Sequence, residues 1–186
     1  MLLDEILYLY QNLIFKVDST CQKLAALYME HLVCKPGCSQ CCQVERTVCA
    51  VESYIVEQQL LTLSDQKIKR LKKLNKDNDE TCPLLLRDRC VIYPARPIIC
   101  RTHGLPILYR EAERTFIDYC RLNFTNLAEG YEFKKQNILN MNSFNIELVK
   151  IDKLFAEHIL KKPWHPANRK SLKKILFGNR LKNRQF

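Results

Sequence analysis

The chain has 186 residues, of which 47% are hydrophobic and 27% are charged, and this composition excludes general disorder. The net charge of +10 is uneven. Residues 150–186 carry eleven Lys or Arg against two acidic residues (+9), whereas residues 1–149 carry 19 basic and 18 acidic residues (+1). The charge therefore does not predict a nucleic-acid-binding domain. It marks a basic C-terminal segment that either contacts phosphates or an acidic partner, or is simply solvated.

The N-terminal stretch lacks the features of a targeting segment. Asp4 and Glu5 stand where a secretory signal needs positive charge, and Gln11, Asn12 and Lys16 interrupt the apolar residues that follow. The sequence predicts neither a secretory signal nor a membrane span, and it predicts a cytoplasmic protein. Because cysteines are reduced in that compartment, a metal site is favoured over a disulfide framework.

Apolar residues recur at helical spacing in several stretches of the chain. They predict helices at residues 2–33 (one helix, or two with a break near 18–20), 52–61, 65–74 with Ser64 as N-cap, 143–160 and 171–177. Shorter apolar runs predict a small hairpin around residues 87–89 and strands at 105–109 and 115–119. The expected fold is mostly α, with a small irregular β hairpin, as a single domain organised around a cysteine metal centre.

Four regions follow from this pattern. They are an N-terminal helical segment of the core (1–33), a cysteine-cluster metal-binding region (34–121), a helical remainder of the core (122–162) and a basic C-terminal extension (163–186).

Four of the ten cysteines lie within nine residues, in the pattern CxxxCxxCC around a Pro-Gly turn. Cys21 and Cys49 lie in apolar surroundings and are interpreted as small core residues. The other eight are the candidate metal ligands: Cys34, Cys38, Cys41, Cys42, Cys82, Cys90, Cys100 and Cys120.

Thiolates are the ligands that zinc and iron–sulfur clusters select, and four per site is the usual number. Cys41 and Cys42 are adjacent, with α-carbons only about 3.8 Å apart, and would chelate one ion through a cramped ring. The pair more easily serves different metals, which favours a polynuclear centre or two neighbouring sites. The cofactor prediction is therefore an iron–sulfur cluster of the 4Fe–4S kind, with zinc as the alternative.

Three later motifs contain the other four candidate cysteines. They are Cys82-Pro-Leu-Leu, then Arg89-Cys90-x-Ile92-Tyr93-xx-Arg96-Pro97-xx-Cys100-Arg101, then Cys120. Together with residues 34–42 they resemble the YkgJ-like cysteine-cluster family, a CxxCxxCC zinc- or iron-chelating domain, over about residues 34–121. The resemblance implies metal binding by the eight cysteines. It extends distantly to flagellin lysine N-methylases, whose activity is not carried over because the chain is much shorter and shows no S-adenosylmethionine site.

Five arginines stand among the later cysteines: Arg87, Arg89, Arg96, Arg101 and Arg121. Arg96 and Arg101 are the strongest candidates for donating hydrogen bonds to sulfur, because a four-thiolate zinc or a cube carries about two negative charges. His103 has ligand spacing from Cys100 but is more simply a hydrogen-bonded side chain. No catalytic residue is predicted.

Three functions fit these features. The first is a redox protein, or an accessory to a modifying enzyme, that holds an iron–sulfur cluster. The second is a structural zinc module whose basic tail binds nucleic acid or an acidic partner. The third is a metal carrier or storage protein.

Overall fold

The computed structural model describes residues 1–35, 37–78, 80–128 and 130–178. The chain divides into two compact units. The first unit contains residues 1–35 and 98–154, and the second contains the described parts of residues 36–97 and 155–186. Each unit therefore combines segments that are distant in sequence.

In the first unit, the long helix α1 (Leu3–Leu27) carries a buried stripe of Ile6, Tyr10, Leu13, Val17 and Leu24. It runs without a break through residues 18–20, where one of the two predicted forms placed an interruption. It ends before the predicted limit at residue 33, and a 3-10 turn follows, η1 (Met29–His31).

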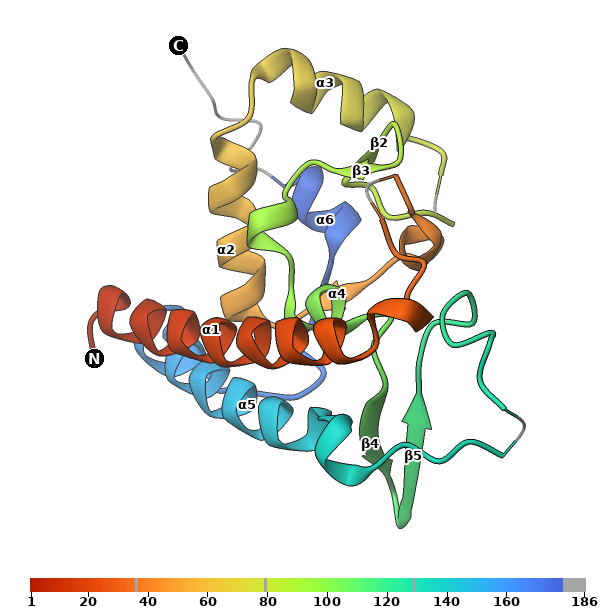
Figure 1. The fold of residues 1–186 in the computed structure, drawn as a ribbon. Coiled ribbons are helices and arrows are strands. Elements are labelled where there is room, and N and C mark those ends of the chain that lie inside the picture. The colour runs from red at the N-terminus through yellow and green to blue at the C-terminus, as the bar shows by residue number, and fades with distance from the viewer. Residues whose placement is uncertain (36, 79, 129, 179–186) are drawn as a thin grey trace. The chain divides into compact units, whose positions relative to one another are not determined.

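Helices α4 (Ile98–Thr102) and α5 (Met141–His158) accompany α1 in this unit, except that α5 passes into the second unit after Leu154. Figure 1 shows α5 lying along α1. Lys16 of α1 pairs with Glu147 of α5 at 2.7 Å, so polar side chains also join the two helices.

A small sheet completes the first unit. Strand β4 (Ile107–Glu111) pairs antiparallel with β5 (Arg114–Asp118) and parallel with β6 (Leu139–Asn140). The two predicted strands are confirmed within one or two residues of their expected limits. The short β6 was not predicted, because two residues carry no alternating pattern. A 3-10 turn, η4 (Lys135–Asn137), precedes it.

The second unit contains helices α2 (Ala50–Leu61), α3 (Asp65–Leu74) and α6 (Leu172–Leu176). The predicted limits of α3 are confirmed, and Ser64 Oγ accepts a hydrogen bond from Lys67 N at 3.4 Å as its N-cap. Strands β1 (Thr47–Val48) and β7 (Lys170–Ser171) pair antiparallel, so the chain's late segment joins this unit.

The predicted hairpin around residues 87–89 is confirmed in the second unit. Strands β2 (Leu85–Leu86) and β3 (Arg89–Cys90) pair antiparallel, with Leu85 opposite Cys90. Arg87 and Asp88 form the two-residue turn with φ values of 52° and 58°. Positive φ at both turn residues matches the twist of the flanking strands. The 3-10 turns η2 (Gln40–Cys42) and η3 (Tyr93–Ala95) complete the unit.

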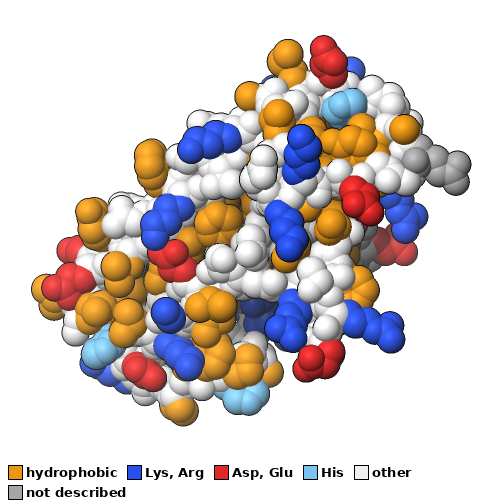
Figure 2. Space-filling view, turned by 60° about the horizontal axis from the view of Figure 1, so that its bottom comes forward, with side chains coloured by type: hydrophobic (Ala, Val, Ile, Leu, Met, Phe, Trp, Pro, Cys, Tyr) orange, Lys and Arg blue, Asp and Glu red, His pale blue; other side chains and the backbone are white. Residues whose placement is uncertain are grey.

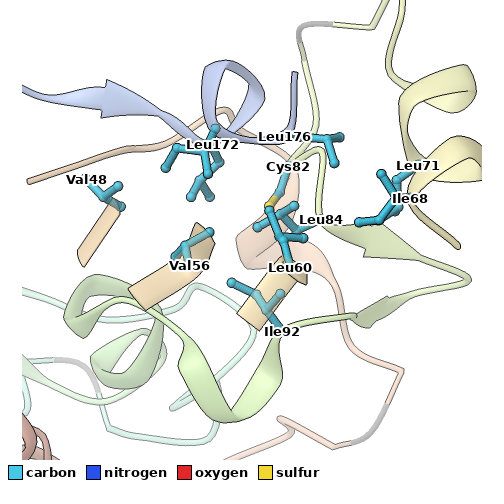
Figure 3. Close-up of a cluster of buried hydrophobic side chains, with 11 residues drawn as sticks. Val48, Val56, Leu60, Ile68, Leu71, Cys82, Leu84, Ile92, Leu172 and Leu176 are labelled. Atoms are coloured by element: carbon cyan, nitrogen blue, oxygen red, sulfur yellow. The ribbon is translucent and has the colours of Figure 1, made fainter. Parts of the chain in front are cut away.

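Eleven buried side chains form the hydrophobic core of the second unit (Figure 3). Cys82 belongs to this core, and Cys42 and Cys90 pack against it. Leu172, Ile175 and Leu176 of α6 are buried in it as well. Of the two lysines in the same helix, Lys173 is half-buried and Lys174 is exposed. Part of the basic C-terminal segment is therefore a core element.

The prediction of a mostly helical fold with a small β-hairpin is confirmed, although the described residues form three small sheets rather than one. Among these residues no helix is both long and apolar enough to cross a membrane. Figure 2 shows Lys and Arg side chains interspersed with hydrophobic and acidic ones on the face displayed.

Candidate metal centre

The cysteine loop turns sharply before it presents its thiols. Gly37 has φ of 98°, a conformation that residues with a side chain rarely adopt. The chain then forms the single 3-10 turn η2, closed by a 2.8 Å hydrogen bond from Cys42 N to Ser39 O. As a result the Cys41 and Cys42 sulfurs lie 3.9 Å apart and share a hydrogen bond.

Cys82, which is 40 residues after Cys42 in the sequence, lies beside this pair. Its backbone N–H donates to Cys42 O at 2.7 Å, and its thiol hydrogen-bonds with the thiol of Cys42. Cys90, on strand β3, is close enough for its charge to act on Cys42 and for the charge of Cys41 to act on it. We refer to Cys41, Cys42, Cys82 and Cys90 as the thiol cluster.

The pKa values of Cys41, Cys42 and Cys90 are raised, so these thiols ionise less readily. The pKa of Cys41 is raised by its hydrogen bond with Cys42, by burial and by the charge of Cys42. The hydrogen bond from Cys41 lowers the pKa of Cys42, but the hydrogen bond with Cys82, burial and the charges of Cys82 and Cys90 together raise it to about 11. Burial raises the pKa of Cys90. Forming several thiolates here therefore requires a compensating positive charge.

All eight candidate ligands lie in the part of the chain that matches a known family model. Residues 33–122 match the family model CxxCxxCC, described as a "putative zinc- or iron-chelating domain". The resemblance predicted from the cysteine motifs is thereby confirmed, and binding of zinc or iron is supported. No curated protein and no solved structure matches the chain.

Two arginines of the CxxCxxCC domain bring positive charge to the thiol cluster. Arg46 donates from Nη2 to Cys41 O at 3.4 Å, and its charge opposes the rise in the pKa of the Cys41 thiol. The charge of Arg96 does the same for Cys90, and its guanidinium lies 3.8 Å from the centre of the Tyr93 ring. The predicted hydrogen bond from Arg96 to sulfur stays a prediction, although its charge acts on Cys90. Arg46 was not predicted.

Arg101, the other arginine singled out, lies in the first unit and donates to Asp18 at 2.7 Å. The Arg101 side chain is 8% exposed and that of Asp18 is 35% exposed, so only the arginine end of this ion pair is shielded from water. His103 is exposed, and His31 places its Nδ1 2.7 Å from Asn126 Oδ1.

Cys34 of the CxxCxxCC domain lies in the first unit and is exposed, but it is held by a buried amide. Asn123 Nδ2 lies 3.5 Å from the Cys34 sulfur and donates to Gly104 O at 2.8 Å. Asn123 Oδ1 accepts from Val33 N at 3.0 Å. A Cβ at Gly104 would lie 3.3 Å from the Cys34 sulfur, so glycine permits this close approach.

The remaining cysteines are distributed between the two units. Cys100 lies on α4, and Cys120 is buried and accepts from Asn123 N at 2.9 Å through its carbonyl. Cys38 lies half-buried in the cysteine loop of the second unit. Cys49 is buried, as predicted.

Cys21, also predicted to be a small buried residue, is only half-buried, because it lies beside the stripe of α1 that faces the core.

Some polar residues around the cysteines were not predicted from the sequence. Asn123 is 1% exposed, and no spacing rule points to an amide three residues after a cysteine. Ser39 Oγ donates to Asp88 Oδ1 at 2.9 Å and thereby ties the cysteine loop to the β2–β3 turn. Glu45 Oε1 is buried and has no hydrogen-bond partner in the described part of the chain.

Within the described residues, no three His, Cys, Asp or Glu side chains already have the arrangement of a metal site. The thiol cluster is held by hydrogen bonds between thiols and by packing against the core. Its chemistry nevertheless fits a soft metal: four sulfurs from three segments, two nearby guanidinium groups and partial burial.

Proposed function

We propose that the chain binds an iron–sulfur cluster through thiolates of Cys41, Cys42, Cys82 and Cys90, in a reducing cytoplasmic environment. The observation that carries this proposal is the meeting of four thiols from the cysteine loop, the segment after α3 and strand β3. When bound, the cluster supplies one-electron redox chemistry, which suits a redox protein or an accessory to a modifying enzyme.

The conformation of the adjacent pair supports a polynuclear centre. Cys41 and Cys42 lie in the 3-10 turn η2, where consecutive side chains leave the axis about 120° apart. Because the two side chains leave the backbone in different directions, rotation of their thiols, now 3.9 Å apart, would let them bind two different irons. Arg46 and Arg96 offset the negative charge that such a cluster brings.

A second candidate is a tetrathiolate zinc site, and one distance favours it. Two sulfurs on a tetrahedral zinc with Zn–S bonds of about 2.3 Å lie about 3.8 Å apart. The Cys41 and Cys42 sulfurs are 3.9 Å apart, so both would fit one ion after small rotations. Zinc would then stabilise the second unit without redox chemistry.

The remaining predicted ligands, Cys34, Cys38, Cys100 and Cys120, are retained in the proposal as candidate ligands or as thiols beside the metal. Metal content measured for a Cys→Ser variant of each of the eight cysteines would assign these roles. A ligand variant lowers the bound metal, whereas a variant of a nearby non-ligand thiol alters the spectrum with the metal retained.

Anaerobic purification followed by metal analysis and absorption spectroscopy tests the proposal. An iron–sulfur protein is brown, contains iron and inorganic sulfide, and absorbs light at about 400 nm. Cys42→Ser and Cys82→Ser are expected to abolish this absorption. Cys49→Ser is the matched control, because Cys49 is a buried cysteine at the N-cap of α2, where serine is well tolerated.

A colourless protein with stoichiometric zinc, lost in the same two variants, would replace the first candidate with the second. Equal metal content in the wild type, Cys42→Ser and Cys82→Ser would reject this site altogether.

A further inference from the structure

Three arginines and one leucine line an open pocket of about 480 Å³ in the second unit: Arg70, Leu86, Arg87 and Arg89. Arg70 comes from α3, and the other three come from the β2–β3 hairpin. Figure 1 shows this hairpin beside α3. Side chains from two elements therefore converge on one space.

The pocket and the thiol cluster lie on opposite faces of the hairpin, because successive side chains of a strand alternate between its two faces. Leu86 and Arg89 are opposite each other in the register and share one face, whereas Leu85 and Cys90 share the other. One face therefore presents the Cys90 thiol to its cluster, and the other presents Arg89 and Leu86 to the pocket.

The turn holds Arg87 at the pocket and directs its acidic neighbour elsewhere. Arg87 has φ of 52°, which fixes the backbone of the turn in one conformation. The Asp88 carboxylate accepts from Ser39 Oγ at 2.9 Å, in the cysteine loop. Asp88 is also not among the residues that line the pocket.

The positive charges at the pocket are permanent, and no ion pair of the described residues neutralises them. Guanidinium groups remain protonated at every physiological pH. None of the ion pairs found among the described residues includes Arg70, Arg87 or Arg89. All three arginines are exposed, so water screens much of their mutual repulsion, and an anion between them would lower the remainder.

We propose that this pocket binds a small molecule carrying two or more oxyanion groups, either phosphates or carboxylates. Guanidinium groups bind both by paired N–H···O hydrogen bonds, which accounts for arginine rather than lysine at all three positions. A volume of about 480 Å³ lies within the usual range for small-molecule sites and exceeds the needs of one phosphate ion. Leu86 supplies an apolar surface for the ligand's carbon skeleton.

This proposal does not rest on the metal, since the three guanidinium groups keep their charge whichever metal the thiol cluster holds. Arg89 and Cys90 are adjacent, however, so a ligand in the pocket lies one residue from a proposed metal ligand. Metal content is therefore measured for each pocket variant. Unchanged metal with lost anion binding separates the two sites.

Titration calorimetry with inorganic pyrophosphate and with citrate, at low salt on the protein as purified, tests the proposal. We expect at least one of the two to bind, and the preferred one identifies the phosphate or the carboxylate class. Arg70→Gln, Arg87→Asn and Arg89→Gln should each weaken binding by about tenfold or more, the effect of losing one charge-assisted contact. Asparagine is chosen at position 87 because it tolerates positive φ.

Arg114→Gln is the matched control, because it removes the same charge from an exposed residue of β5 in the first unit. It should leave the Kd for the bound anion within about twofold. Failure of both anions to bind would overturn the proposal. Equal weakening by Arg114→Gln would also overturn it, by showing a non-specific charge effect, as would binding of an RNA oligonucleotide in place of both small anions.

Discussion

The cysteines lie in two different kinds of environment. In the second unit the thiol of Cys42 interacts with those of Cys41 and Cys82, and Cys82 belongs to the hydrophobic core. In the first unit Cys34 is exposed and lies against the amide of the buried Asn123. One set of sulfurs is positioned by other sulfurs, and the single sulfur of Cys34 is positioned by a hydrogen-bonding side chain.

The two environments act on the cysteines in different ways. A group of partly buried thiols resists ionisation and gains most from a cation, because neighbouring thiolates disfavour one another. An exposed thiol held by an amide depends on the hydrogen bonds of that amide instead. Removing a metal should therefore act mainly on the second unit, and removing the amide mainly on the first.

The largest expected effect is that of metal removal. Structural zinc sites contribute about 10–16 kcal/mol to folding, and the metal is proposed to lie between η2 and the Cys82 segment. Chelation should therefore speed hydrogen exchange at the Cys82 N–H, which donates to Cys42 O at 2.7 Å, on the order of 100-fold or more. The Phe124 N–H, which donates to His31 O at 2.8 Å in the first unit, is the reference amide.

The same chelator should change nothing in Cys42→Ser, which is proposed to hold no metal. Equal acceleration at the Phe124 and Cys82 amides of the wild type would contradict the assignment of the site to these four thiols.

A smaller but substantial effect is expected for Asn123→Ala. The substitution leaves Val33 N–H and Gly104 C=O without their side-chain partner and removes the group that contacts the Cys34 sulfur. Buried polar groups that lose a partner cost about 1–3 kcal/mol each, so unfolding free energy should fall by about 2–4 kcal/mol. Urea unfolding of the metal-free protein measures this change.

Asn126→Ala is the matched control for Asn123→Ala. Asn126 is an exposed amide three residues later, whose Oδ1 lies 2.7 Å from His31 Nδ1. Its removal should cost less than about 1 kcal/mol. Similar losses in the two variants would mean that burial of Asn123 does not set the environment of Cys34.

Local signals in the sequence were sufficient for several elements of the fold. Ser64 predicted the start of α3, and the short apolar runs on either side of residues 87–89 predicted the β2–β3 hairpin, because both signals depend on neighbouring residues only. The suggested break in α1 does not occur. Thr20 Oγ1 donates to Lys16 O at 2.8 Å within the helix, so this polar side chain is satisfied without ending it.

The candidate site was less predictable than the fold. The cysteine motif predicted which residue types bind metal, but not that Cys42 and Cys82 would be joined by a backbone hydrogen bond. Such contacts form between residues 40 apart and depend on how the core of the second unit packs. Asn123 was missed for the same reason: its partners Val33, Cys34 and Gly104 come from two segments that are distant from it in sequence, and no local pattern contains them.

The smallest expected effect is a pH dependence confined to the second unit. In the metal-free protein the pKa of Cys42 is about 11, above its ordinary 9.0, so the folded state binds its proton more tightly than the unfolded chain does. The resulting stability is fully present below pH 9.0 and is lost as the pH rises through about 11, because the unfolded state then binds fewer protons. Cys41 and Cys90, whose pKa values are also raised, act in the same direction. Unfolding free energies measured anaerobically across this window should therefore fall more steeply for the wild type than for Cys42→Ser, in which that thiol no longer titrates. The Asn123→Ala variant, altered in the first unit, should retain the wild-type slope, and a slope that Cys42→Ser leaves unchanged would show that its thiol does not titrate in this range.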